Sequence, residues 1–219
     1  MKKLVVVGVL VLLALRGNAQ EKRETLLDRV NDAMSKAAAA SGIIKEHGEP
    51  RRVLKGAKPE LVLRDDQLIF NGMPLRLGQA LEKWETVLPG TRRCQGEKII
   101  DGCVWDDAGI LVVMQNTDPT KIGSVKIYLQ LPDEEEREPL QPTHAFNGYL
   151  ELDGFGMDTE TQFWEVRKSV RKERNIRCGL RDCAAPHGAL GKTTAIYFML
   201  SKPNENGTLR AVELGGGIL

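Results

Sequence analysis

Residues 68–77 read Leu68-Ile69-Phe70-Asn71-Gly72-Met73-Pro74-Leu75-Arg76-Leu77. An Asn-Gly pair between two apolar runs is the strongest short-range signal for a β-hairpin. The reason is that a type I′ turn needs positive φ angles at both central positions, which Asn and Gly adopt most easily. The stretch therefore predicts two antiparallel strands joined by a two-residue turn.

The residues after this hairpin predict a helix and then further strands. Apolar residues at helical spacing lead up to Pro89-Gly90, where the helix should end: Ala80, Leu81, Trp84, Val87 and Leu88. Strands are predicted around 103–105 and over 109–114 and 124–131, the last of which alternates apolar and polar residues. This part of the chain is therefore predicted to combine one helix with an antiparallel sheet.

The second half of the chain repeats this order at an offset of 82 to 84 residues. A second turn dipeptide, Asp153-Gly154, precedes a second predicted helix, marked by Phe163, Val166 and Val170, and strands follow over 194–200 and 207–214. Self-similarity at a fixed offset indicates a repeated structural unit. We therefore expect an α+β fold of two tandem pseudo-repeats, each a helix packed on a small antiparallel sheet.

The four cysteines predict two disulfides. Four cysteines allow three pairings, and each predicted repeat carries two of them, Cys94 and Cys103 in the first and Cys178 and Cys183 in the second. If the repeat is real, each pair closes a small loop within its own half, and each half carries one local disulfide.

The N-terminus predicts export. Lys2 and Lys3 precede an almost wholly apolar run over 4–15, and the small residues Gly17 and Ala19 stand where a signal peptidase requires them. A transmembrane anchor needs about 20 apolar residues, and Arg16 ends this run earlier. We expect a signal peptide cleaved after Ala19, a periplasmic protein, and no membrane insertion after cleavage.

These patterns divide the chain into five parts. Residues 1–19 are the predicted signal peptide, and 20–58 hold a predicted N-terminal helix (21–47) and a linker. The first repeat is predicted at 59–131 and the second at 144–219. Residues 132–143, with three prolines and a run of charges, are predicted to link them.

Neither the charge nor the motifs point to a cofactor, a metal or a nucleic acid. The net charge of +1 gives no electrostatic case for a nucleic-acid or membrane-surface partner. Gly191-Lys192-Thr193 lacks the preceding glycine of a phosphate-binding loop, because Pro186 stands there. The three histidines lack a second ligand at metal-binding spacing. We predict a protein without catalytic residues, cofactor or metal.

Acidic residues are the remaining candidates for a site. Asp106 and Asp107 follow Trp105 at a predicted strand end, and Glu134, Glu135 and Glu136 lie in the linker. Neighbouring strand residues point to opposite faces, so the two aspartates are not expected to share a proton as a catalytic pair does. They fit a turn between strands, a hydrolase site, or, with the glutamates, a surface that contacts a basic partner.

Several motifs resemble those of a family of exported bacterial proteins of unknown function. They are Leu75-x-Leu77-Gly78, Trp105-Asp106-Asp107-x-Gly109-Ile110 and Phe146-x-Gly148-x-Leu150-x-x-x-Gly154. The resemblance covers about residues 65–160 and extends to periplasmic immunity proteins that act against type VI secretion toxins, including phospholipases. A repeated helix-and-sheet unit with its own disulfide is also similar to the tandem repeats of beta-lactamase inhibitor proteins, a likeness of architecture that does not by itself give a function.

The resemblance implies a periplasmic protein that binds and inhibits a toxin, with a phospholipase effector as the favoured target. Two alternatives stay open: an envelope hydrolase that uses Asp106 or Asp107, and a housekeeping envelope protein that assists assembly or carries a small ligand.

Overall fold

The computed structural model describes residues 47–56, 58–64, 67–96, 101–133, 139–187, 194–203 and 205–216. The predicted signal peptide and nearly all of the predicted helix over 21–47 lie outside these residues. The chain divides into the units Met1–Gly48 and Glu49–Leu219, and the account below concerns the second. Among the described residues, no helix has the length and apolar character needed to cross a membrane.

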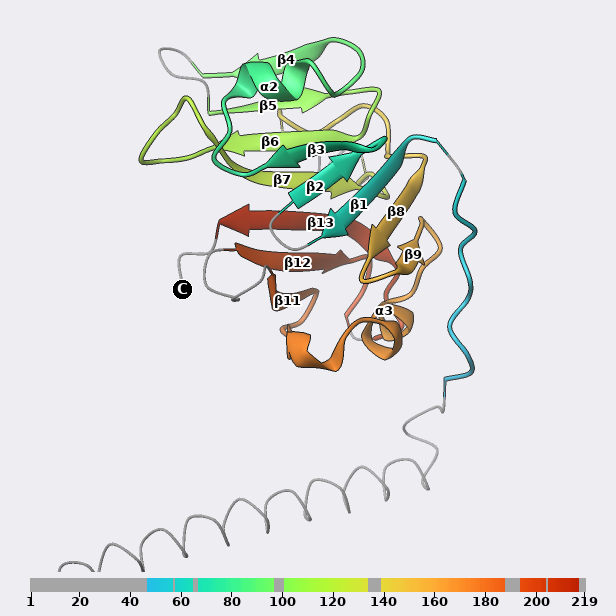
Figure 1. Cartoon of the computed structure of the whole chain (residues 1–219). Coiled ribbons are helices and arrows are strands. Elements are labelled where there is room, and N and C mark those ends of the chain that lie inside the picture. Colours follow the sequence, from blue (N-terminus) through green and yellow to red (C-terminus); the bar gives the residue numbers. More distant parts are fainter. Residues whose placement is uncertain are drawn as a thin grey trace, which may run out of the picture. The chain divides into compact units, whose positions relative to one another are not determined.

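A five-stranded sheet contains the predicted hairpin (Figure 1). Its strand order is β3-β2-β1-β8-β9, with β1 at Glu60–Arg64, β2 at Gln67–Phe70, β3 at Met73–Arg76, β8 at Tyr149–Leu152 and β9 at Phe155–Met157. Asn71 and Gly72 have φ angles of 48° and 84°, and the β2–β3 hairpin predicted from them is confirmed. Asp153 and Gly154, at 54° and 83°, form the equivalent turn between β8 and β9.

The small sheet also joins segments that are far apart in the sequence. Strand β1 pairs in parallel with β8, with Leu61 opposite Leu150 and Leu63 opposite Leu152. Glycine is required at Gly148, just before β8, because a Cβ atom there would overlap the Pro59 carbonyl oxygen and the Phe146 ring. The two predicted halves therefore share this sheet.

An eight-stranded antiparallel sheet forms the other layer, in the order β10-β11-β12-β13-β7-β6-β5-β4 (Figure 1). The first half of the chain supplies β4 (Arg92–Gln95), β5 (Gly102–Trp105), β6 (Ile110–Met114) and β7 (Ile122–Tyr128). The second half supplies β10 (Arg177–Cys178), β11 (Asp182–His187), β12 (Thr194–Leu200) and β13 (Leu209–Gly216). The two sets meet where β7 pairs with β13.

The helices are shorter than the sequence predicts. Helix α2 spans Leu81–Glu85, α3 spans Phe163–Ser169, and a 3₁₀ helix, η2, spans Lys172–Arg174. The predicted continuation of α2 to Leu88 is a turn, in which Val87 and Leu88 both donate backbone hydrogen bonds to the Trp84 carbonyl. The expected pair of helix-on-sheet repeats is therefore corrected to a largely β protein of two sheets, because the apolar residues after each hairpin form only one or two helical turns.

One hydrophobic core lies between the two sheets and takes in both helices. It unites Leu61 and Phe70 of the small sheet with Val112 and Ile127 of the large one. Its largest fully buried side chains are Trp84, Trp105, Phe70, Phe146, Phe163 and Phe198. This common core packs against one face of the large sheet.

Candidate functional site

The face of the large sheet that points away from the core is a surface that both halves build together. Side chains alternate along a strand, so the positions between the core residues point outward. On the central strands β6, β7, β13 and β12 these positions are Leu111, Val113, Ser124, Lys126, Tyr128, Ala211, Glu213, Gly215, Ala195, Tyr197 and Met199. We refer to this surface as the outer face.

A charged pair crosses the junction of the two halves on the outer face. Lys126 on β7 lies directly opposite Glu213 on β13 in the strand register. The Lys126 Nζ atom is 3.6 Å from Glu213 Oε2 and 5.6 Å from the centre of the Tyr128 ring. Cross-strand pairs of opposite charge contribute about 0.2–1 kcal/mol. The pair favours this register and leaves both charges partly exposed to a partner.

Residues beside and within the linker between the two predicted repeats cover part of the outer face. Leu131 and Leu140, which flank the linker's charge run, pack on a small apolar cluster whose buried members are Val104, Leu111, Tyr128 and Ala211. The Leu140 side chain lies 3.3 Å from where a Cβ atom of Gly102 would stand, so glycine makes room for it. Val113, 40% exposed on β6, belongs to the part of the outer face that stays open.

Asp106, a predicted candidate, helps to hold that linker in place. Its Oδ2 and Oδ1 atoms accept hydrogen bonds from Arg93 at 2.7 and 3.0 Å, and Oδ1 also accepts one from the Thr143 N–H at 2.8 Å. Arg93 also donates to the backbone carbonyls of Pro139 and Gln141, both at 3.0 Å.

These contacts decide the ionisation of Asp106. The Arg93 guanidinium lowers the pKa of the Asp106 carboxyl below its ordinary value, and this outweighs the opposing effect of partial burial. A general acid needs a raised pKa to hold its proton near neutral pH. Asp106 is therefore an ionised clamp for the linker.

The other predicted acidic candidates are placed differently. The Asp107 side chain is 78% exposed, and its Oδ1 atom lies 3.7 Å from Nδ1 of His144, which is also exposed. The two aspartates thus have separate surroundings: Asp106 is bonded to Arg93 and Thr143, and Asp107 points into solvent near His144. Glu134, Glu135 and Glu136 lie outside the described residues.

The two disulfides fasten the ends of the large sheet. Cys94 on β4 is bonded to Cys103 on β5, and Cys178 on β10 is bonded to Cys183 on β11. Both pairs stand directly opposite each other in neighbouring antiparallel strands, with Cα atoms 4.0 Å apart. Each outermost strand is thus tied covalently to its neighbour. Such bonds are typical of oxidising compartments.

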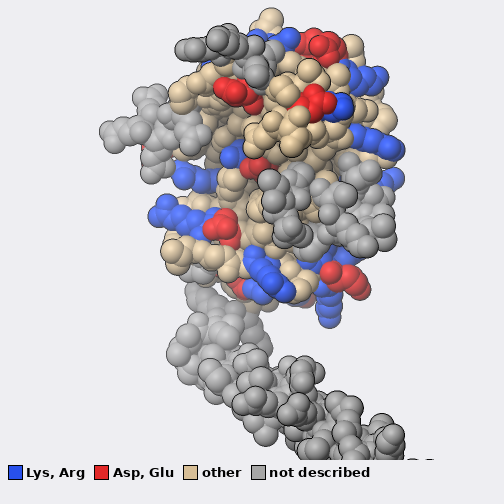
Figure 2. All heavy atoms as spheres, turned by 90° about the vertical axis from the view of Figure 1, so that its left-hand side faces the viewer, with Lys and Arg blue, Asp and Glu red and all other residues tan. Residues whose placement is uncertain are grey.

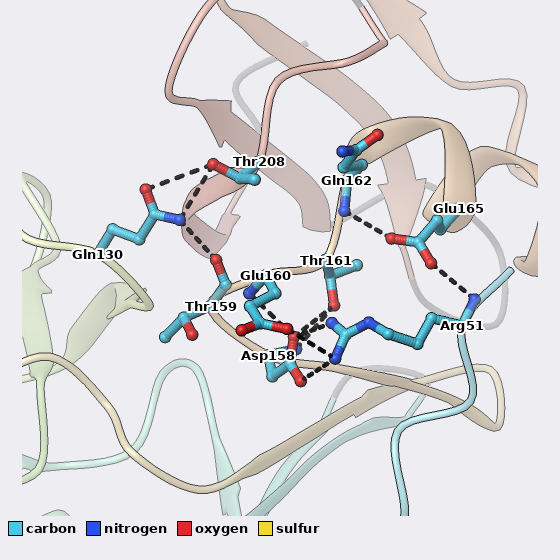
Figure 3. A network of polar contacts seen from close by, with 9 residues as sticks. All are labelled: Arg51, Gln130, Asp158, Thr159, Glu160, Thr161, Gln162, Glu165 and Thr208. Atoms are coloured by element: carbon cyan, nitrogen blue, oxygen red, sulfur yellow. Dashed lines mark hydrogen bonds and ion pairs between the residues drawn. The ribbon is translucent and has the colours of Figure 1, made fainter.

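A polar network at the start of α3 holds the segment before β1 (Figure 3). Arg51 forms an ion pair with Asp158, and its backbone N–H donates to Glu165 Oε1 at 2.7 Å. The second Glu165 oxygen accepts from the backbone N–H of Gln162 at 2.8 Å, which caps α3. One buried carboxylate therefore caps the helix and anchors the incoming chain.

A pocket of about 330 Å³ adjoins this network. It is lined by Val53, Phe146, Asn147, Gly148, Tyr149, Asp158, Thr159 and Glu160. Burial opposes the ionisation of Asp158, but hydrogen bonds from Arg51, the Glu160 N–H and the Thr161 hydroxyl outweigh it and lower its pKa. Burial, with the hydrogen bond to Glu151, raises the pKa of Tyr149 to about 12. The Asp158 carboxylate in the pocket lining is thus held by hydrogen bonds within the fold.

Reading the sequence did not identify Lys126, Glu213 or Arg51. Strands were predicted around the first two, and alternation along them indicates which residues point outward. That β7 and β13 are neighbours is a contact between distant segments, and it is this contact that brings Lys126 to Glu213. No local pattern marks Arg51 as the partner of Asp158, 107 residues away.

A family model described as a domain of unknown function (DUF7738) matches residues 60–167. The match begins at β1 and ends within α3, so it includes the first half of the large sheet, the linker and the β8–β9 hairpin. No curated protein and no solved structure matches the chain.

Proposed function

We propose that this chain is a periplasmic immunity protein that binds and inhibits a type VI secretion toxin, with a phospholipase effector as the favoured target. The observation that carries the proposal is the outer face of the eight-stranded sheet. This surface is built from both halves of the chain and backed by one core, and a protein partner would have to cover about 800 Å² of it.

The rigidity of this surface supports inhibition by surface binding. Ordering a loose surface costs affinity when a partner binds. Here the core supports the sheet from behind, and a disulfide fastens each end strand. The outer face is therefore preorganised, as an inhibitor requires.

The composition of the outer face fits a contact with a protein. Ser124, a small residue that is partly exposed, lets a partner's backbone approach closely. Val113 offers exposed apolar area, and Lys126 and Glu213 offer partly exposed charges of both signs. Interfaces of this kind combine an apolar centre with polar groups that fix the partner's orientation.

We also infer that the two halves are one unit used twice. The turns at Asn71-Gly72 and Asp153-Gly154 share their positive φ angles, and a short helix follows each turn. Four strands follow each helix, and in each set the first two strands carry a cross-strand disulfide. The repeat supports the likeness of architecture to beta-lactamase inhibitor proteins.

The signal peptide predicted at 1–19 supports the periplasm as the place of action, and the two disulfides agree with it. A binding role needs no catalytic residue, and the proposal assigns none. The Asp106 carboxylate is occupied by its bonds to Arg93 and Thr143, and this favours a binding role over a hydrolase that uses Asp106.

The first test is capture of the partner. The processed protein, purified with its disulfides intact, is used to retain proteins from an envelope extract of a strain that expresses its secretion effectors. We expect one secreted toxin to be retained in near-equal amount. Separately, deleting the gene should make cells sensitive to kin that carry this toxin, and full resistance of the deletion strain would refute the proposal.

A matched pair of variants tests the surface. Val113→Arg places a large charge on the outer face, whereas Met73→Arg places it on edge strand β3 of the small sheet, at a similar exposure of 43% against 40%. We expect the first variant to lose the toxin and the second to keep it. Equal binding by both variants would exclude the outer face as the contact.

A further inference from the structure

Positive charge is concentrated at one end of the large sheet. Between residues 167 and 181 the chain has seven Lys and Arg residues against one acidic residue, although the whole chain has a net charge of only +1. They are Arg167, Lys168, Arg171, Lys172, Arg174, Arg177 and Arg181. We refer to this segment as the basic end. Figure 1 places α3, η2 and β11 together there, and Figure 2 shows Lys and Arg side chains along the same lower end.

Three of these cations are available to a partner. Arg174 and Arg171 form ion pairs with Asp153, and Arg167 and Lys168 form ion pairs with Glu205 and Glu49. Within the described part of the chain, Lys172, Arg177 and Arg181 form no ion pair, and all three are exposed. The net charge of +1 is a sum over the whole chain, and the basic end carries a local excess of positive charge.

A pocket at the basic end has the chemistry to hold a phosphate group. It has a volume of about 240 Å³, and its lining is Arg167, Val170, Arg171, Lys172, Asn175 and Ile176. Three cationic side chains and an amide surround it, while two apolar side chains complete the wall. Guanidinium and ammonium groups form strong charge-assisted hydrogen bonds to phosphate oxygens.

An exposed apolar side chain stands beside these cations. Leu180 is 82% exposed in the turn between β10 and β11, with Arg177 and Arg181 on either side of it in the chain. The disulfide between Cys178 and Cys183 closes this turn. The tip therefore presents Leu180 to solvent.

We propose that the basic end docks on a bilayer that contains anionic phospholipids. Leu180 enters the boundary between headgroups and acyl chains, the exposed cations attract the negative surface, and the pocket beside Lys172 takes one lipid phosphate. An apolar tip among cations gains from both the acyl boundary and the anionic headgroups. The inference goes beyond toxin binding and does not rest on it.

The test is flotation of the full, processed protein with lipid vesicles. Vesicles of phosphatidylethanolamine with phosphatidylglycerol are compared with vesicles of phosphatidylcholine alone, at low and high salt. We expect binding to the anionic vesicles only, weakened by salt as for exposed charges. Each cation near an anionic surface contributes severalfold to affinity, so the double variant Lys172→Glu and Arg177→Glu should bind about tenfold more weakly or worse.

Two further variants separate this proposal from general charge effects. Arg64→Glu with Lys83→Glu makes the same change in net charge at exposed positions of β1 and α2 and should bind like the unchanged protein. Leu180→Ser should weaken binding while leaving its salt dependence unchanged. Equal binding to both kinds of vesicle, or equal losses in the two double variants, would overturn the proposal. Binding of an acidic protein but of no vesicle would assign the basic end to a protein partner and overturn it as well.

Discussion

The ion pair between Asp153 and Arg174 offers the sharpest test of the packing described above. Asp153 lies in the β8–β9 turn with a φ angle of 54°, and its side chain is 4% exposed. Arg174 Nε and Nη2 donate to its two carboxylate oxygens at 2.5 and 2.6 Å, and the Arg174 side chain is 10% exposed. Asparagine also tolerates this backbone conformation, so Asp153→Asn removes the charge and little else.

The structure sets the expected size of the effect. Removing one partner of a buried ion pair leaves the other charge uncompensated and costs about 3–5 kcal/mol. The asparagine oxygen can still accept one hydrogen bond from Arg174, so we expect the lower end, about 3 kcal/mol. Because urea lowers stability by about 1–3 kcal/mol per molar, the unfolding midpoint should fall by roughly 1–3 M.

The assay is equilibrium unfolding in urea with the disulfides oxidised, followed by tryptophan fluorescence. Asp107→Asn is the control, because it makes the same chemical change on a side chain that is 78% exposed. The control should alter the free energy of unfolding by no more than about 0.5 kcal/mol. A loss below about 1 kcal/mol in Asp153→Asn, or an equal loss in both variants, would refute the reasoning.

The same pair predicts a pH dependence. Burial opposes the ionisation of Asp153, but Arg174 and Arg171 outweigh it, so the pKa of Asp153 is lower in the folded protein than in the unfolded chain. A lowered folded pKa contributes stability above the unfolded value of about 3.9, and this is lost as the pH falls through the folded pKa. The difference in stability between the unchanged protein and Asp153→Asn should therefore shrink in unfolding curves recorded below about pH 4.

Three further changes test separate parts of the fold by the same unfolding measurement. Glu165→Ala removes the carboxylate that caps α3 and anchors the segment before β1, and should lower the free energy of unfolding by about 2 kcal/mol. Glu160→Ala is its control and should cost little, because Glu160 is 79% exposed. Gly148→Ala forces a methyl group against the Pro59 carbonyl and should cost about 1–3 kcal/mol or prevent folding; an unchanged midpoint would contradict the close approach. Replacing Cys94 and Cys103 together with Ser opens a loop with a sequence separation of 9 and should cost about 3 kcal/mol.

Local turn chemistry could be predicted from the sequence. Asn71-Gly72 and Asp153-Gly154 form the predicted turns, because few residues adopt positive φ angles without strain. The disulfide pairs also followed from local order, since each pair lies within one short antiparallel connection. Helix length was predicted less well: apolar spacing continued to Leu88, but α2 ends at Glu85 and a turn completes the pattern.

The candidate site could be predicted only in part. The sequence indicated Asp106 and Asp107 as candidates. In the structure Asp106 is bonded to Arg93 and holds the linker, whereas Asp107 is exposed to solvent. The outer face depends on which strands are neighbours, and nothing within 124–131 or within 207–214 specifies the other. The basic end is visible in the sequence as a charge run, but its pocket and its exposed Leu180 exist only after folding.

The sequence by itself determined the turns, the disulfide pairs and the strands that alternate, because each depends on the conformational preferences of residues that are close together in the chain. Only the tertiary structure decided that β1 pairs with β8 and β7 with β13, and with them the single core and the joint outer face. The physical reason is that pairing between distant strands is chosen by the burial of both partners at once. Which distant strands pair therefore depends on all the apolar faces of the sheets and helices, because they are buried in one core together.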